Sequence, residues 1–356
     1  MRSPSTGTVE DFSSALFPAG DLFASPVEGL RMVQEFAHQP VMATEVVDLF
    51  ATVPPGVVVD GTVGGGGHAA AVLAAHPHLG VLGLDRDPDA LDAAGRRLRP
   101  FGNRAVLRHA RFGDLGAEVA AARAGTWPAT DGGDAVAGVL LDLGVSSPQL
   151  DRSDRGFSYR NPGPLDMRMD RTTGPTAGEL VNEADVAELA ALFAANGEGR
   201  LSGRIARAVV AARPITTTSE LADVVAAAVP AAARRRGHPA RRVFQALRIA
   251  VNDELDQLAA VLPDALDLLA PGGRLVVIAY HSGEDRMVKT AMAEAATGGC
   301  TCPPGLPCVC GARPDHRLVF RGAKKPSAAE LAANHRAESA RLRAVERLAA
   351  AGGEQS

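Results

Sequence analysis

Lysine is almost missing from this chain of 356 residues, occurring only at Lys289, Lys324 and Lys325, whereas arginine is abundant. The choice of arginine at any single position therefore carries no chemical information. The formal net charge of −4 also excludes an overall basic excess, so charge alone predicts no nucleic-acid partner.

Long apolar runs and a targeting signal are absent as well. No run of 18 apolar residues occurs, so we expect no membrane span. The first 30 residues lack a basic start followed by an apolar core, which argues against a secretory signal and predicts a cytoplasmic protein. The chain is nevertheless 46% apolar, enough for a sizeable core in one large domain or two modest ones.

The most informative stretch begins with an apolar run, Val57–Asp60, that ends in a carboxylate and breaks into the glycines Gly64–Gly67. His68 and an alanine-rich helical segment follow, which is typical of the first βαβ unit of a nucleotide-binding fold. Asp85 ends the next apolar run about 20 residues later, where a carboxylate can accept hydrogen bonds from ribose hydroxyls. A P-loop is excluded because no Lys-Ser/Thr pair follows the glycines.

Two other interpretations of the glycines stay open. Gly65-x-Gly67-x-x-Ala70 also fits a dinucleotide fingerprint, which would suit NAD. A plain strand-to-helix turn is the third interpretation.

Alternating apolar and helical segments predict an α/β fold with a parallel, doubly wound sheet. We expect a helix over 45–50 and strands over 57–60, 81–85, 105–108, 137–142, 274–280 and 317–320. No convincing strand occurs between 151 and 240, which predicts a helical insert. The expected parts are a flexible extension (1–37), the first part of the α/β domain (38–150), the insert (151–240), its second part (241–325) and a polar, helical tail (326–356).

The insert carries the positive charge of the chain. Residues 151–250 contain 15 arginines and 11 acidic residues, a net charge of +4. The charge peaks over 234–242, where arginines could neutralise the phosphates of a polyanion. A solvated helix end explains the same cluster equally well.

The loop after the fourth expected strand is the candidate catalytic segment. Asp142, Ser146, Ser147 and Pro148 lie at a carboxyl end of the sheet, beside whatever the glycine turn binds. Their oxygens could accept hydrogen bonds from an exocyclic amine and orient its lone pair. Asp142 as a cofactor ligand alone is an equal alternative.

Two further segments are candidates for RNA contact. A polar stripe of a helix expected over 241–258 carries Arg241, Gln245, Arg248 and Asn252. His281 follows the expected strand 274–280, again at a carboxyl end, although Ser282 and a carboxylate three residues later could instead form a helix cap.

All four cysteines lie within eleven residues, as Cys-x-Cys-x5-Cys-x-Cys at Cys300, Cys302, Cys308 and Cys310. Four thiolates suit a tetrahedral, structural zinc ion, although Cys-x2-Cys is the usual spacing. Free thiols and redox pairing also stay open, and a cytosolic setting disfavours disulfides.

Several motifs are very specific. They are Asp60-Gly-Thr-Val-Gly-Gly-Gly-Gly-His68, Leu-Asp142-Leu-Gly-Val-Ser-Ser-Pro-Gln149, Arg155-Gly-Phe-Ser, Gly163-Pro-Leu-Asp-Met-Arg-Met-Asp170, Phe244-Gln-Ala-Leu-Arg-Ile-Ala-Val-Asn252 and Tyr280-His-Ser-Gly-Glu-Asp-Arg286. In this order, from His38 to about Phe320, the chain strongly resembles the bacterial MraW/RsmH family. The resemblance implies a class I, Rossmann-like methyltransferase that uses S-adenosylmethionine to methylate the N4 amine of a cytidine in 16S ribosomal RNA, in the decoding region.

The resemblance also implies residue roles. Cofactor contacts would come from Gly66, Gly67 and His68 at the turn, Asp85 at the ribose, Phe112 on the adenine, and Asp142 with Gln149. The basic cluster, the polar stripe and the strand end described above, rather than the resemblance, point to Arg234, Arg235, Arg241, Arg248 and His281 as RNA contacts. Gln149 replaces the aromatic residue of the similar Ser-Pro-Pro-aromatic loop, which leaves Phe157 or Tyr159 to stack on the target base.

Two competing functions remain at this point: an NAD-dependent oxidoreductase, and a non-catalytic ribosome-binding module with a vestigial cofactor site. The expected partner is 16S ribosomal RNA within the small subunit, and a homodimer is left open.

Overall fold

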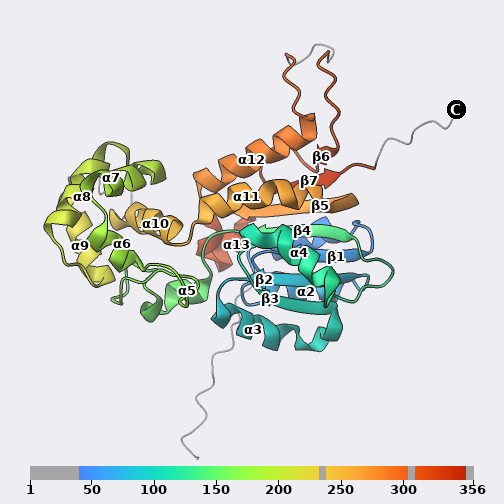
Figure 1. Ribbon diagram of the computed structural model, residues 1–356, viewed down its shortest axis with the longest axis horizontal. Helices are drawn as coiled ribbons and strands as arrows, with labels where there is room; N and C mark the ends of the chain where they lie inside the picture. The colour runs from blue at the N-terminus through green and yellow to red at the C-terminus, as the bar shows by residue number, and fades with distance from the viewer. Residues whose placement is uncertain (1–39, 232–237, 304–308, 350–356) are drawn as a thin grey trace, which may run out of the picture. The chain divides into compact units, whose positions relative to one another are not determined.

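Seven strands form one sheet with the order β3-β2-β1-β4-β5-β7-β6 in the computed structural model, which describes residues 40–231, 238–303 and 309–349 (Figure 1). The strands are β1 (Gly56–Asp60), β2 (Leu79–Asp85), β3 (Ala105–His109), β4 (Val136–Asp142), β5 (Leu269–Ala279), β6 (His316–Leu318) and β7 (Arg341–Arg347). The first five run parallel, and β7 is antiparallel to both β5 and β6. The expected Rossmann-like α/β fold is confirmed.

Helices cover both faces of the sheet. They are α1 (Ala43–Phe50), α2 (Gly67–Ala75), α3 (Pro88–Leu98), α4 (Leu115–Ala124), α11 (Glu254–Asp267) and α12 (Ser282–Thr297). Because side chains alternate along a strand, Val58 packs with α1, α2 and α3, whereas Val57 and Val59 pack with α4, α11 and α12. The β-branched run of β1 is therefore buried on both sides, as central parallel strands require.

The helical insert has a hydrophobic core of its own. Its helices are α5 (Ser147–Asp151), α6 (Ala177–Glu183), α7 (Val186–Phe193), α8 (Ser202–Ala211), α9 (Thr218–Ala228) and α10 (Ala240–Val251). Thr176, Asp185 and Thr217 each begin a helix with a capping box, so these starts are encoded locally. Phe157, Phe193 and other apolar residues of the insert form a cluster separate from the two that flank the sheet.

The structure moves one expected boundary. Phe244 and Leu247 of α10 pack into the core of the insert, so the insert extends to 251 rather than ending at 240. The expected single helix over 241–258 is also wrong. It breaks after Val251, where Asp253 adopts a left-handed backbone with φ 51° before α11 begins.

The expectation of a helical tail is wrong for its last part. In the described part of the tail, up to residue 349, Ala328–Ala333 is the only α-helix (α13), and Arg341–Arg347 forms β7, inserted between β5 and β6. Arg343 of β7 binds Asp285 at 2.8 Å, and Glu346 binds Arg274 at 2.8 Å. These tertiary ion pairs and the burial of Leu342 and Val345 hold a helix-prone sequence in a strand.

The extension expected over 1–37 lies outside the described residues. Within the described residues, no helix has the length and hydrophobicity needed to cross a bilayer.

Candidate active site

Three carboxylates end three neighbouring strands. Asp60 closes β1, Asp85 closes β2 and Asp142 closes β4, and β1 pairs with both of the other strands. The chain reverses its winding direction between β1 and β4, and ligands of doubly wound sheets bind beyond the strand ends at such a point. The fold therefore gathers these acids at the position where a ligand is expected.

Asp85 ties the glycine turn to the loop after β2. Its Oδ2 accepts the Gly64 N–H at 2.8 Å, and its Oδ1 accepts the Asp87 N–H at 2.8 Å. Burial raises the pKa of Asp85 to about 6, against the lowering effect of these hydrogen bonds. A carboxylate has about four lone-pair sites, so it can still accept hydrogen bonds from a ligand diol.

The turn itself depends on glycine. Gly66 precedes the first residue of α2, Gly67, with φ 75°, a left-handed conformation that glycine adopts without the steric cost of a Cβ atom. A Cβ atom there would also lie 3.2 Å from the Cα atom of Ala94. The turn can therefore pack closely on α3 while the first N–H groups of α2, which lack intrahelical acceptors, stay open to a ligand.

His68 is buried at this turn, with 6% of its surface exposed. Its Nε2 lies 3.5 Å from Asp142 Oδ2, yet neither ring nitrogen has a hydrogen-bond partner with good geometry among the described residues. Buried polar groups nearly always find a partner, so this ring points to a ligand that would supply one.

Asp142 is anchored by a residue that the sequence analysis missed. Tyr280 follows β5 and donates its hydroxyl to Asp142 Oδ1 at 2.9 Å, and the Asp142 N–H donates to Thr62 Oγ1 at 2.6 Å. Burial, together with the charge of Asp142, raises the pKa of Tyr280 well above its usual value. The signal was available, since Tyr280 directly follows a strand of the same sheet.

Asp60 is the second missed group. It is 2% exposed and accepts only the Thr62 N–H, at 3.2 Å, in the described residues. Burial raises its pKa to about 7; the charge of His68 opposes this rise, whereas the charges of Asp142 and Asp85 add to it. The carboxylates at the ends of β1 and β2 thus receive less stabilisation from the described residues than their burial costs.

The loop after β4 is held by its own side chains. Ser146 accepts the Gln149 N–H and Gln149 Oε1 accepts the Ser146 N–H, a capping box that starts α5 over Ser147 and Pro148. Gln149 Nε2 donates to Asp87 Oδ2 at 2.8 Å. Both ends of this buried amide are bonded within the protein, so Gln149 positions the loop, and its predicted contact with the cofactor stays a prediction.

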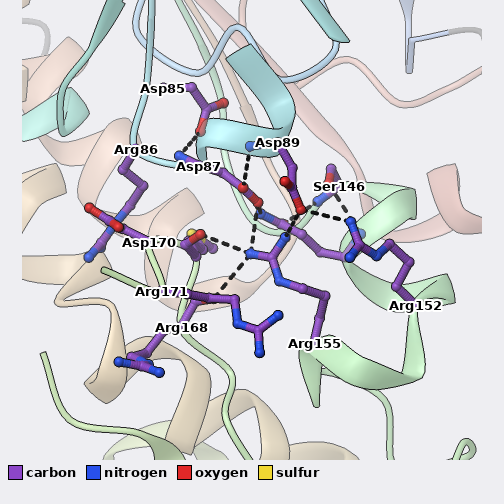
Figure 2. Close-up of polar contacts among 12 residues, drawn as sticks. Asp85, Arg86, Asp87, Asp89, Ser146, Arg152, Arg155, Arg168, Asp170 and Arg171 are labelled. Atoms are coloured by element: carbon purple, nitrogen blue, oxygen red, sulfur yellow. Dashed lines mark hydrogen bonds and ion pairs between the residues drawn. The ribbon is translucent and has the colours of Figure 1, made fainter. Parts of the chain in front are cut away.

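Asp87 is also the point where the insert joins the sheet (Figure 2). Arg155 donates to Asp87 Oδ2 at 2.8 Å and to the Met169 carbonyl at 2.8 Å, and both side chains of this ion pair are almost fully buried. Because Asp87 lies two residues after Asp85, the insert is fastened next to the carboxylate that the sequence analysis predicts to bind the cofactor.

Asn252 makes a second joint and is not the exposed RNA contact that the sequence predicted. It is fully buried. Its side-chain Nδ2 donates to the Met167 carbonyl at 2.8 Å, and its Oδ1 accepts the Met169 N–H at 2.9 Å. Its backbone carbonyl accepts a hydrogen bond from Arg86 at 2.7 Å. It therefore links α10, the loop 165–170 and the segment after β2.

The other predicted RNA contacts divide into three groups. Arg241 is exposed at the start of α10, as expected, whereas Arg234 and Arg235 lie outside the described residues. Arg248 is engaged in an interior ion pair, with Nε and Nη2 donating to Glu254 at 2.8 and 2.7 Å, so these two groups are not available to a phosphate. His281 caps α12 in a box with Glu284: its Nδ1 accepts the N–H groups of Gly283 and Glu284, and its Nε2 lies 3.0 Å from Glu284 Oε1.

The aromatic candidates also separate. Phe157 is buried in the core of the insert, whereas Tyr159 is partly exposed and stacks on His238 with ring centroids 4.5 Å apart. Phe112 lies in the turn after β3, beside Gly61 at the end of β1, where its predicted contact with adenine stays a prediction.

Comparisons with known proteins agree on one family. A model of the MraW methylase family matches residues 35–348. Proteins called ribosomal RNA small subunit methyltransferase H are 50% identical in Heliobacterium modesticaldum, over 88% of this chain and 99% of the relative, and in Thermobifida fusca, over 87% and 93%. A solved rRNA methylase from Streptococcus thermophilus matches 86% of this chain and 95% of its own with a TM-score of 0.38 and 12% identity, so the fold assignment depends on the strand order instead.

Proposed function

The chain belongs to the MraW methylase family, and from this premise we propose that it methylates the N4 amine of a cytidine in the RNA of the small ribosomal subunit, in the decoding region. The protein is a methyltransferase, and its methyl donor is S-adenosylmethionine. Its relatives' name supplies the class of RNA. The site supplies the reasons for the amine and for the residue roles.

The observation that carries the proposal is the row of three carboxylates, Asp60, Asp85 and Asp142, at neighbouring strand ends. The donor contains a sulfonium cation, which such a row attracts. A dinucleotide would instead bring an anionic pyrophosphate, which the row would repel. The charge of the site therefore favours S-adenosylmethionine over NAD, and the oxidoreductase alternative loses its basis.

The cofactor roles follow from the contacts of each group. Asp85 would accept the ribose hydroxyls with its remaining lone pairs, and Gly66 and Gly67 would let the cofactor approach the backbone. The unpartnered ring nitrogens of His68 would bond its polar groups, and Phe112 would pack on the adenine. When bound, the donor supplies an electrophilic methyl group attached to a positively charged sulfur.

Asp142 would orient the substrate amine. The lone pair of a cytosine amine is delocalised into the ring, so catalysis consists mainly of positioning and electrostatics. Tyr280 fixes Oδ1 of Asp142, which leaves Oδ2 to accept a hydrogen bond from the amine and turn its lone pair toward the methyl group. Asp142 would also accept the proton that the amine nitrogen loses when it takes up the methyl group.

The helical insert would hold the RNA. Its net charge of +4 and the exposed Arg241 suit phosphates, and Tyr159 is the partly exposed aromatic candidate for the target base.

The test is nucleoside analysis of small subunits methylated in vitro. Subunits that lack the modification are incubated with the enzyme and methyl-labelled S-adenosylmethionine, and their RNA is digested and chromatographed. We expect the label in N4-methylcytidine. Label confined to a ring-carbon methyl would overturn the assigned chemistry, and RNA binding without any transfer would favour the non-catalytic module.

A further inference from the structure

A long loop leaves the sheet region between α12 and β6 and projects away from it (Figure 1). Its two ends meet closely. Gly298 ends α12 with φ 60°, and a Cβ atom there would lie only 2.7 Å from the backbone carbon of Arg313. The base of the loop is thus fixed by backbone packing, whereas the cysteines lie farther along it.

Apolar burial does not fix the described residues of this loop. None of the described residues among 298–315 is buried, and Val309 is 90% exposed. Short segments that cannot bury a core are usually fixed by a disulfide or a metal ion. The loop therefore needs a cross-link if it has one conformation.

Three thiols converge in this loop. The Sγ atoms of Cys300, Cys302 and Cys310 all lie within 4.8 Å of one another, with Cys300 and Cys310 3.6 Å apart. A disulfide would bring two sulfurs to about 2.05 Å. Thiolates at about 2.3 Å from a tetrahedral zinc ion lie about 3.8 Å from one another, which matches the observed spacing.

The backbone adds a second observation. The N–H of Val309 donates to Cys302 Sγ at 3.4 Å, across the loop. Such a bond favours a charged sulfur, because a thiolate is the stronger acceptor. The backbone near Cys310 is therefore folded toward a sulfur in the arrangement that a metal ligand requires.

We propose that Cys300, Cys302 and Cys310 bind one zinc ion, which fixes the conformation of this loop. The ion is structural and remote from the reaction. Helix α12 has 16 residues and is about 24 Å long; its first residues adjoin the active site, whereas the cysteines follow its last. Cys308, which the sequence analysis grouped with these three cysteines, lies outside the described residues.

The test uses the full chain purified under reducing conditions without chelators. Elemental analysis should find about one zinc ion per chain, as one closed site predicts. The Cys302→Ser variant should lose this zinc, and the matched Val309→Ala variant, changed at an exposed position of the same loop, should retain it. Cobalt substitution should give thiolate-to-cobalt absorption in the wild type and in Val309→Ala only.

A binding measurement separates this proposal from the proposed function. Cys302→Ser should bind S-adenosylmethionine within about twofold of the wild type, because the loop lies at the far end of α12. Wild-type protein without zinc after exposure to equimolar zinc, or zinc retained by Cys302→Ser, would overturn the metal site. So would thiol titration showing a disulfide between these cysteines in protein prepared without reductant.

Discussion

A row of carboxylates at one end of the sheet and Asp166 of the helical insert show opposite pKa shifts. At the carboxyl ends of β1, β2 and β4, called the sheet edge below, burial raises the pKa values of Asp60 and Asp85 to about 7 and about 6, because no arginine among the described residues pairs with them. In the insert, burial would also raise the pKa of Asp166, but hydrogen bonds from Arg168 and the charges of Arg168 and Arg171 outweigh it and lower that pKa. Asp166 is thus electrostatically satisfied, whereas Asp60 and Asp85 at the sheet edge are not.

This difference separates stability from chemistry. A satisfied ion pair fixes a conformation, as Arg155 and Asp87 do at the joint of the two regions. An unsatisfied row of acids opposes folding but prepares a site for a cation. The comparison predicts that substitutions in the joint mainly affect stability and RNA use, and that substitutions at the sheet edge mainly affect the cofactor and catalysis.

Breaking the joint should have the largest effect. Replacing Arg155 by Met leaves the buried Asp87 carboxylate without its cation, which costs about 3–5 kcal/mol of unfolding free energy. The neighbouring Arg152, which pairs with Asp89 and Asp154 at the surface, is the matched control, and Arg152→Met should cost at most about 1 kcal/mol. Urea unfolding measures both.

The same variant tests whether the regions are functionally distinct. Arg155→Met should lose much more RNA methylation than affinity for S-adenosylmethionine, because Asp85 keeps its hydrogen bonds from Gly64 and Asp87. A parallel fall in both would mean that the joint belongs to the cofactor site.

Removing a charge from the sheet edge should have the second-largest effect. Asp142→Asn preserves the shape of the side chain but removes the charged acceptor, so kcat should fall by about 10²–10³-fold with little change in unfolding free energy. Asp131, exposed in the same region, provides the control, and Asp131→Asn should leave kcat unchanged. A kcat within threefold of wild type for Asp142→Asn would end the proposed role of this carboxylate.

The joint and the sheet edge also differ in how far the sequence could predict them. Strands β1 to β5, the glycine turn, Asp85 and Asp142 were predictable, because an apolar run that ends in a carboxylate is a local signal. Asn252 was predicted to contact RNA, since nothing local reveals that it bonds Met167, a partner that only tertiary packing brings near. His281 differs, because its partner Glu284 lies three residues away and a helix cap at this position was an open alternative.

Strand β7 was not predicted from the sequence, for a related reason. Arginine, leucine, alanine and glutamate favour helices, so Arg341–Arg347 resembles a helical tail. Its alternation becomes meaningful only when β5 pairs with it and Asp285 meets Arg343. Intrinsic propensity is a weak guide where a sheet edge offers hydrogen bonds and burial.

Removing the hydroxyl that orients Asp142, while leaving the carboxylate in place, should lower kcat less than Asp142→Asn does. Tyr280→Phe deletes the hydroxyl that donates to Asp142 Oδ1, and a hydrogen bond to a charged group is worth about 1.5–3 kcal/mol. We expect kcat to fall by about tenfold or somewhat more, with KM for RNA unchanged. An effect on KM alone would place Tyr280 in RNA binding instead.

The acid row should also show in the pH dependence. The pKa of Asp60 is 3.8 in the unfolded chain and about 7 in the folded protein, so the folded state binds more protons between these values. The unfolding free energy of the cofactor-free protein therefore falls as pH rises through this window. In Asp60→Asn this fall should be smaller, and in Asp131→Asn it should be unchanged. A wild-type profile that rises relative to Asp60→Asn would contradict the raised pKa.

A cation should reverse this trend. Bound S-adenosylmethionine favours the ionised acids, so its affinity should increase by up to about tenfold per pH unit for each proton released, as pH rises toward about 7. Calorimetry in two buffers of different ionisation enthalpy measures the proton release directly. Binding without proton release would mean that the sulfonium does not interact electrostatically with these carboxylates.

The smallest effect should arise in the insert. Arg241 is exposed on α10, and if it contacts one phosphate, Arg241→Ala should lower RNA affinity only a few-fold but reduce the slope of log Kd against log salt concentration by about 1. Arg96, exposed on α3 of the sheet region, is the matched arginine, and Arg96→Ala should leave the slope unchanged. Since both substitutions remove one positive charge from the protein, a general electrostatic attraction would lower the two slopes alike. Only a phosphate contact of Arg241 would make the two slopes differ. Equal slopes would therefore contradict the proposal that the insert, and not the sheet region, holds the RNA.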